Sequence, residues 1–135
     1  MPKKNFSSLI IAGSDSGSGA GIQGDIKTFS LHGVYAATVI TALTAQNTKG
    51  VQDIYNIPAR FIEKQIKAII ADFNIKYIKI GMLSNIEIIN IIDFCLKKYL
   101  HDIPVILDPV MYAKGGYVLL KKDAVKSLIK KLIPR

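Results

Sequence analysis

Residues 10–25 read IIAGSDSGSGAGIQGD, an apolar run that stops at Gly13 and gives way to small, polar residues before an amphipathic segment begins. In this pattern a buried strand ends and is followed by a flexible loop that can form part of a binding site. Glycines let backbone N–H groups approach a ligand closely, because no Cβ stands in the way. We expect Asp25 in the first turn of the following helix, where the helix dipole favours a carboxylate. The stretch therefore predicts a small-molecule site at the top of an α/β sheet.

Strands and helices alternate along the rest of the chain. Runs of β-branched and apolar residues predict strands, and apolar residues at helical spacing predict helices. This alternation is typical of right-handed βαβ units, which build a mostly parallel sheet covered on both faces. The predicted strands cover residues 7–12, 34–43, 75–80 and 105–107, with a short extended piece at 51–55, and the predicted helices cover 21–31, 58–73, 85–99 and 121–132.

Polar segments follow each of these strands. In a parallel sheet the carboxyl ends of the strands lie at one edge, and ligands bind beyond that edge. We therefore expect the segments to converge there, which is a stronger indication of a site than any single loop. The segments are residues 13–21, 46–48, 81–84 and 108–116.

The composition fits one domain over residues 1–135 with a sizeable core. Half of the residues are hydrophobic, and the mean hydropathy is +0.29. The single cysteine, Cys95, lies in an apolar helical pattern and is expected to be buried. With no second cysteine for an internal disulfide, we expect the protein in a reducing compartment. Residues 1–5 are basic, but the apolar stretch at 9–12 is too short for a signal peptide. We therefore expect a cytoplasmic protein without a membrane span.

The chain is strongly basic, with a formal net charge of +8. Its lysines fall on the outer faces of the predicted helices and are not interleaved with aromatic residues, as a nucleic-acid surface would require. A solvated basic surface explains this charge better than a nucleic-acid partner, and it also attracts phosphate-bearing ligands.

Common glycine motifs do not account for the loop. Residues 19–24 match G-x-G-x-x-G, but a long loop precedes them and no acidic residue follows the second strand to hold a ribose. A dinucleotide site is therefore disfavoured. A P-loop is excluded because Asp25 stands where lysine would be needed. The sequence holds no spacing typical of a metal site and no nucleophile elbow.

Four blocks of sequence nevertheless resemble one known family. In order and spacing they are similar to hydroxymethylpyrimidine/phosphomethylpyrimidine kinases, thiamine-biosynthesis enzymes of the ribokinase-like fold that are related to bacterial pyridoxal kinases. The resemblance covers nearly the whole chain and implies a three-layer α/β/α domain with a mostly parallel sheet. The blocks are AGSDSGSGAGIQGDIKTF (12–29), VITALTAQNT (39–48), KIGML (79–83) and LDPVM (107–111).

The resemblance implies phosphorylation of 4-amino-5-hydroxymethyl-2-methylpyrimidine and then of its monophosphate, with ATP and Mg²⁺. The Gln46 amide can donate to and accept from an aminopyrimidine, Asp25 can accept from its amine or hydroxyl, and Met82 can cover the ring. Asp108 and Lys114 are expected near the phosphates and metal. Position by position, the implied pyrimidine pocket consists of Gly13, Ala20, Asp25, Gln46, Met82 and Val110.

Each of these residues also has a purely structural interpretation. Asp25 is then a helix-end carboxylate, Gln46 a loop-stabilising amide and Met82 part of the core. Asp108 is then the start of an Asp-Pro turn, and Lys114 a solvated lysine.

Members of the family continue beyond the point that matches Arg135. We expect residues 1–135 to form the N-terminal part of a single ribokinase-like kinase domain. Its catalytic base is expected in the absent part, together with a second glycine-rich loop for the transferred phosphoryl group. Such a chain is expected to have impaired activity, and to form a homodimer or need a separate C-terminal polypeptide. Two alternatives remain open, a non-catalytic pyrimidine-binding fragment and an enzyme similar to pyridoxal kinase.

Overall fold

The computed structural model describes residues 7–134, so the basic residues 1–5 lie outside the described part of the chain. Strands and helices alternate as the sequence predicts. The strands are β1 (Ser7–Asp15), β2 (Tyr35–Asn47), β3 (Gly50–Asn56), β4 (Ile75–Ile80) and β5 (Val105–Leu107). The helices are α1 (Gly21–Leu31), α2 (Ala59–Ile70), α3 (Ile86–Tyr99) and α4 (Lys122–Lys131).

The strands form a five-stranded sheet in the order β3-β2-β1-β4-β5. The central strand β1 is parallel to both β2 and β4, β4 is parallel to β5, and only the edge strand β3 is antiparallel to its neighbour. β1 and β2 run beyond their predicted ends because their pairing resumes after a register shift between Ala12 and Ser14. The first residues of the glycine loop therefore still belong to strand β1, although their composition predicts a loop.

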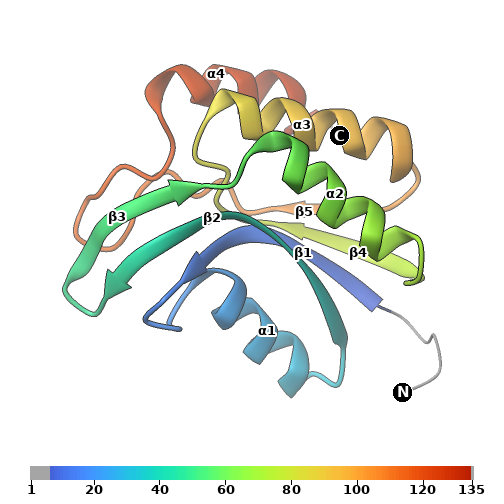
Figure 1. Cartoon of the computed structure of the whole chain (residues 1–135), viewed down its shortest axis with the longest axis horizontal. Coiled ribbons are helices and arrows are strands. Elements are labelled where there is room, and N and C mark those ends of the chain that lie inside the picture. Colours follow the sequence, from blue (N-terminus) through green and yellow to red (C-terminus); the bar gives the residue numbers. More distant parts are fainter. Residues whose placement is uncertain (1–6, 135) are drawn as a thin grey trace.

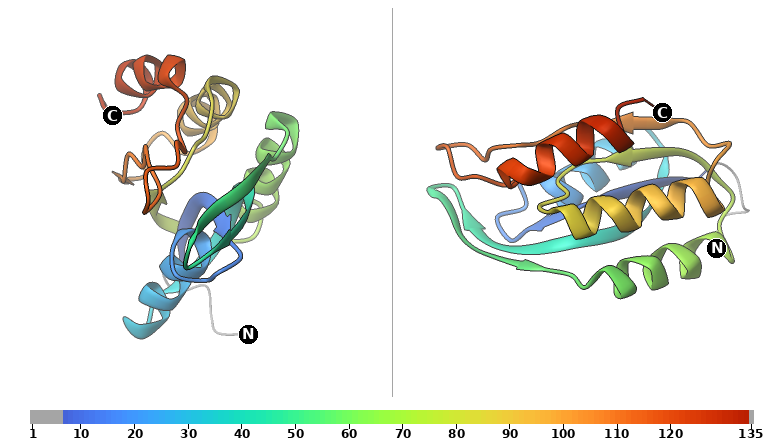
Figure 2. Two further views of the ribbon diagram at one scale, coloured as in Figure 1. Left: turned by 90° about the vertical axis from the view of Figure 1, so that its left-hand side faces the viewer. Right: turned by 90° about the horizontal axis from the view of Figure 1, so that it is seen from above.

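The helices are divided unequally between the two faces of the sheet. Helices α2, α3 and α4 lie side by side on one face, and α1 lies alone on the other (Figures 1 and 2). The main core lies between the three-helix layer and the sheet, where Ile62, Ile78 and Ile92 are fully buried. Helix α3 begins cleanly because the side chain of its N-cap, Asn85, accepts a hydrogen bond from the backbone N–H of Ile88.

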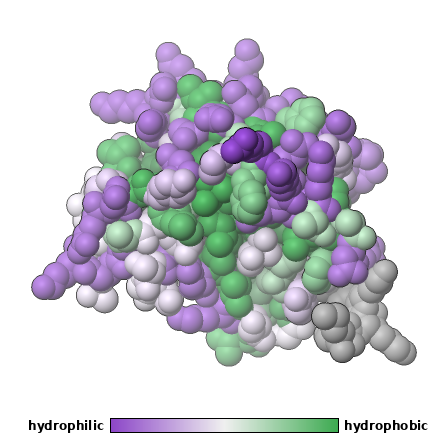
Figure 3. All heavy atoms as spheres, viewed as in Figure 1, coloured by the Kyte–Doolittle hydropathy of each residue, from purple (hydrophilic) through white to green (hydrophobic). Residues whose placement is uncertain are grey.

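The second face is covered only in part. Helix α1 packs on β1 and β2, around a small cluster that includes Ile10 and Ile22. On β4 and β5, Tyr77 and Ile106 remain more than half exposed. Figure 3 shows hydrophilic side chains projecting from the top of the molecule, where α4 lies, and hydrophobic ones gathered in a band through its middle. Within residues 7–134, no helix is both long enough and apolar enough to cross a membrane.

Cys95 lies on α3 and is fully buried, as its apolar surroundings in the sequence predict. Burial raises the pKa of the Cys95 thiol from 9.0 to about 11. The thiol ionises at a lower pH in the unfolded chain than in the folded chain. The contribution of Cys95 to folding stability is therefore fully present below pH 9 and is lost as the pH rises toward 11. We expect iodoacetamide at pH 9 to label the native chain far more slowly than the urea-unfolded chain. Equal rates would show that Cys95 is accessible.

Candidate functional site

A cavity of about 460 Å³ lies beyond the carboxyl ends of the parallel strands. The glycine loop, the end of β2, the segment after β4 and the long loop after β5 all contribute to its wall. The polar segments therefore converge as the sequence predicts. Every candidate site residue contributes to the lining of this one cavity: Gly13, Ala20, Asp25, Gln46, Met82, Asp108, Val110 and Lys114.

The glycine loop is folded around the carboxylate of Asp15. Its Oδ1 accepts a hydrogen bond from the N–H of Gly17 at 2.8 Å, and its Oδ2 accepts from the N–H groups of Gly19 and Ala20 at 2.9 Å each. Asp15 is only 5% exposed. The N–H groups that a phosphate would need are thus partly taken up by the protein itself. The loop therefore forms a preformed wall of the cavity, and Ala20 is one of the residues that line it.

Gly21 is the position in this loop that only glycine can occupy. Its φ is +55°, and a Cβ built there would overlap the carbonyl oxygen of Gly13. At Gly13 itself a Cβ would stand 3.0 Å from the sulfur of Met82. The first turn of α1 can therefore lie directly against the end of β1, which shapes the floor of the cavity.

Hydrogen bonds join Gln46 to the opposite side of the glycine loop. Its backbone N–H donates to the Oγ of Ser16 at 2.8 Å, and its carbonyl accepts from the same hydroxyl at 2.6 Å. The Gln46 amide oxygen lies 3.4 Å from the Thr44 hydroxyl, which donates to the Ser14 carbonyl at 2.9 Å. The backbone of Gln46 is thus fixed, while its amide N–H₂ makes no hydrogen bond to the described residues.

Asp25 belongs to a charged cluster that the sequence did not predict. Helix α1 has no acidic residue in its first turn, so the expected interaction of Asp25 with the helix terminus is wrong. Instead its Oδ2 lies 2.7 Å from the Nζ of Lys79 on β4, and this Nζ lies 3.9 Å from the Oδ2 of Asp108. Lys79 and Asp25 are about one-fifth exposed, and Asp108 is 59% exposed. One lysine therefore lies between two carboxylates from different elements.

Met82 and Val110 form the apolar part of the wall. Met82 is 7% exposed and belongs to a small cluster with Ala42 and Leu119, against which Val110 packs. The Thr41 hydroxyl donates to the Met82 carbonyl at 2.7 Å and fixes the segment after β4. A flat ring in the cavity would meet this cluster on one side and the glycine loop on the other.

Lys114 lies exposed in the long loop between β5 and α4. The backbone bridge between Tyr112 and Val118 closes this loop, and Gly115 and Gly116 both have positive φ at its tip. Within residues 7–134 no three His, Cys, Asp or Glu side chains converge as a metal site.

A comparison with known protein families shows to which family the chain belongs. The family described as phosphomethylpyrimidine kinase matches residues 15–135. The chain belongs to this family. It is 54% identical over 129 residues to the hydroxymethylpyrimidine/phosphomethylpyrimidine kinase of Haemophilus influenzae, covering 93% of this chain and 46% of the relative. The Escherichia coli enzyme of the same name is 45% identical over 132 residues, covering 98% and 49%.

Solved structures confirm the ribokinase-like fold of this phosphomethylpyrimidine kinase family member. A phosphomethylpyrimidine kinase from Clostridium difficile superposes with a TM-score of 0.87 at 52% identity, covering 96% of this chain and 55% of that one. A Staphylococcus aureus pyridoxal kinase in complex with pyridoxal superposes with a TM-score of 0.79 at 30% identity, covering 96% and 47%. The chain spans about half the length of the curated relatives it matches.

Two further residues of this family member line the cavity, Lys79 and Asp15. No sequence motif gave a role to Lys79, although it stands one residue before the end of the predicted strand IKYIKI, and ligands bind beyond the carboxyl ends of parallel strands. No sequence motif gave a role to Asp15 either. Its part in folding the loop depends on three backbone N–H groups whose directions no sequence pattern gives.

Proposed function

We propose that this chain forms the pyrimidine-binding part of an ATP-dependent kinase that phosphorylates 4-amino-5-hydroxymethyl-2-methylpyrimidine and its monophosphate in thiamine biosynthesis. The observation that carries the proposal is the convergence of every candidate residue on one cavity, in a chain of the phosphomethylpyrimidine kinase family. With ATP as donor, we place this activity in the cytoplasm.

The roles of the residues follow from their chemistry. The free amide N–H₂ of Gln46 donates to a ring nitrogen, and Asp25 accepts from the exocyclic amine or the hydroxymethyl group. The Met82 and Val110 side chains cover one ring face. Lys79 holds the Asp25 carboxylate in place, and the Asp25–Lys79–Asp108 cluster leads from the pyrimidine toward the exposed end of the cavity.

The exposed end of the cavity is the phosphate side in this proposal. ATP supplies the transferred phosphoryl group, and the S. aureus pyridoxal kinase that shares this fold has been solved with ADP and with AMP-PCP. Mg²⁺ binds through one or two carboxylates together with phosphate oxygens, and Asp108 provides such a carboxylate. The Lys114 ammonium lies in the adjoining loop, where it reaches a phosphate.

Calorimetry with the hydroxymethylpyrimidine, with and without ATP and Mg²⁺, tests the proposal. We expect one pyrimidine to bind per chain, with an assay for ADP run in parallel. Binding without turnover would favour the non-catalytic fragment. Absence of binding by a folded chain would contradict a pyrimidine site altogether.

Pyridoxal is the second candidate substrate, because a pyridoxal kinase holding pyridoxal superposes on 96% of this chain. The two substrates are both flat heterocycles with a hydroxymethyl group. The higher identity to the phosphomethylpyrimidine kinase, 52% against 30%, favours the pyrimidine. A side-by-side titration decides between them, and tighter binding of pyridoxal would reverse the assignment.

Lys79→Met is expected to weaken pyrimidine binding about tenfold, because Asp25 would lose the partner that fixes its carboxylate, and a hydrogen bond between charged groups contributes about 1.5 kcal/mol or more. Lys76→Met removes a charge from an exposed position on the same strand and serves as the control. Calorimetry measures both variants. Equal affinities for the two would show that Lys79 has no part in positioning Asp25.

A further inference from the structure

The carboxylate of Asp15 lies where a glycine-rich loop of this kind can hold an anion. Backbone N–H groups that converge on one point form a concave anion site, and many protein-bound phosphates lie in such sites. In this loop the N–H groups of Gly17, Gly19 and Ala20 converge on the Asp15 carboxylate, at 2.8–2.9 Å. The anion in the loop is therefore a side chain of the protein itself.

The two glycines let the carboxylate approach the backbone closely. A Cβ at Gly17 would stand 3.2 Å from the Oδ1 of Asp15, tighter than ordinary van der Waals contact, and a Cβ at Gly19 would stand 3.8 Å from Oδ2. Helix α1 begins directly after this loop, at Gly21, and its N-cap, Ala20, makes no side-chain capping hydrogen bond. The carboxylate therefore also supplies negative charge beside the positive end of the helix.

Hydrogen bonds outside the carboxylate fix the position of Asp15. Its backbone N–H donates to the Oε1 of Gln23 on α1 at 2.8 Å, and the Nε2 of Gln23 donates to the Ser14 hydroxyl at 2.7 Å. The Asp15 carbonyl accepts from the N–H of Ser18 at 2.9 Å. Asp15 is also the last residue of β1 and is paired in register with Thr44 on β2. An anion from solution would have to distort the end of the sheet to displace this carboxylate.

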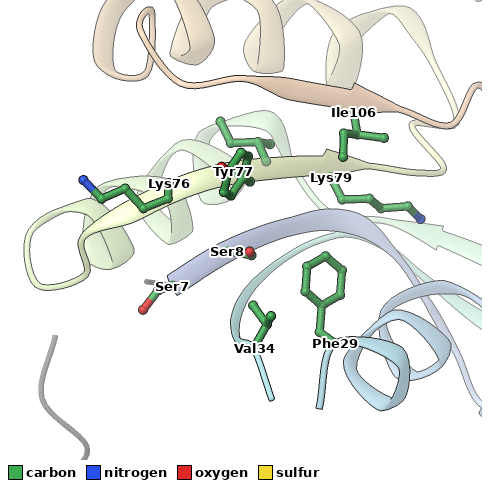
Figure 4. Close-up of a pocket in the computed structure, with 9 residues that line it drawn as sticks. Ser7, Ser8, Phe29, Val34, Lys76, Tyr77, Lys79 and Ile106 are labelled. Carbon is green, nitrogen blue, oxygen red and sulfur yellow. The ribbon is translucent and has the colours of Figure 1, made fainter. Parts of the chain in front are cut away.

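No cation of the described chain shares the Asp15 carboxylate. Within residues 7–134 Asp15 forms no ion pair. Lys79 lines the same cavity, but it extends from β4 toward the carboxyl end of the strand (Figure 4), and its Nζ pairs with Asp25 and Asp108. The charge of Asp15 is therefore offset by the three N–H groups of the loop, and a second anion placed beside it would be repelled.

We propose that Asp15 determines specificity in the candidate site, because its carboxylate fills the anion position of the glycine loop and makes this end of the cavity reject a phosphate. The proposal rests on the proposed function. A pyrimidine monophosphate has two ways to lie in the cavity, with its phosphate at the glycine loop or at the opposite end beside Lys114. Asp15 closes the first orientation. It thereby prevents a reversed complex in which the phosphate is turned away from the exposed end of the cavity.

Asp15→Gly tests the anion position without any pyrimidine. The variant leaves three N–H groups beside the cavity without their acceptor, which lowers stability. We expect about 50 mM formate or inorganic phosphate, compared with chloride at equal ionic strength, to raise the melting temperature of the variant by about 3 °C more than that of the wild-type chain, because an anion bound to the folded state stabilises it. Asp72→Gly removes an exposed aspartate and should respond as the wild-type chain does.

Asp15→Asn separates the loss of charge from the loss of the side chain. Asparagine still fills the anion position, but its N–H₂ group cannot accept from the loop. Formate and phosphate should therefore leave its melting temperature no higher than chloride does, relative to the wild-type chain. Equal responses of Asp15→Gly and Asp72→Gly would overturn the proposal. Equal responses of Asp15→Gly and Asp15→Asn would also overturn it, because the anion would then bind elsewhere.

Calorimetry with the hydroxymethylpyrimidine and its monophosphate distinguishes specificity from a merely structural role. In Asp15→Gly the ratio of the two dissociation constants should shift about tenfold in favour of the monophosphate, since the freed N–H groups make charge-assisted hydrogen bonds to its phosphate. Asp72→Gly should keep the wild-type ratio. An equal loss of affinity for both ligands would show that Asp15 only holds the loop together. If neither ligand binds the wild-type chain, the proposed function fails, whereas the anion response still decides what Asp15 does in the loop.

The wild-type chain carries the test if Asp15→Gly does not fold. Nuclear magnetic resonance follows the amides of Gly17, Gly19 and Ala20 while inorganic phosphate is added. These amides should keep their chemical shifts, because their N–H groups already donate to Asp15. Saturable shifts confined to these three amides would show that the loop accepts an anion despite Asp15, and would overturn the proposal.

Discussion

Asp25→Asn is expected to weaken binding of the hydroxymethylpyrimidine about 100-fold, the largest effect of any single substitution in the cavity. The substitution keeps the shape of the side chain but removes the charge that accepts from the substrate and pairs with Lys79 at 2.7 Å. Hydrogen bonds to charged groups contribute about 1.5–3 kcal/mol, which corresponds to roughly 10- to 150-fold in affinity. Calorimetry at neutral pH measures the change.

Asp72→Asn is the control for this variant, because Asp72 is an exposed aspartate after α2, away from the cavity. It removes the same charge from the chain and should leave pyrimidine affinity unchanged. Urea unfolding of both variants checks that the fold is intact. If Asp25→Asn binds the pyrimidine as tightly as Asp72→Asn does, Asp25 is a structural carboxylate and not a substrate ligand.

Gly21→Ala is expected to destabilise the chain by about 3 kcal/mol or more. An alanine there would have to adopt a φ of +55° and place its Cβ against the carbonyl oxygen of Gly13. Backbone strain of this kind costs about 1–3 kcal/mol, and forcing extra atoms into a packed site costs a similar amount. Urea denaturation, followed by circular dichroism, gives the free energy of unfolding.

Gly33→Ala separates the cost of backbone strain from the cost of steric overlap. Gly33 has a φ of +70° but no atom within 4 Å of a built Cβ, so only the backbone term applies. We expect a loss of about 1 kcal/mol at this position. Equal losses at Gly21 and Gly33 would mean that the contact between α1 and the end of β1 is less tight than the structure gives.

Local patterns were enough to predict most of the fold. The helical spacing of apolar residues after Asn85 predicted α3, and the boundaries of α1, β4 and β5 agree with the sequence analysis. These elements are short-range features, set by periodicity, caps and turns. The ends of β1 and β2 were harder to predict, because polar residues such as Asp15 remain paired in the sheet through a long-range register.

The candidate site was predictable as a set of loops but not as a set of contacts. Asp25 was expected at a helix terminus, whereas its partner is Lys79, 54 residues further along the chain. The order of the strands in the sheet brings these residues together, and no periodic pattern in the sequence predicts that order. The same holds for the open face at Tyr77 and Ile106, because whether a strand face is covered depends on where distant helices pack.

A crystal structure of the chain grown with 4-amino-5-hydroxymethyl-2-methylpyrimidine tests the central claim most directly. The ring should lie in the 460 Å³ cavity between the glycine loop and Met82, with its polar edge on Gln46 and Asp25. The hydroxymethyl group should point toward Asp108 and Lys114. A pyrimidine seated outside this cavity, or a cavity that stays empty while the ligand binds in solution, would contradict the account.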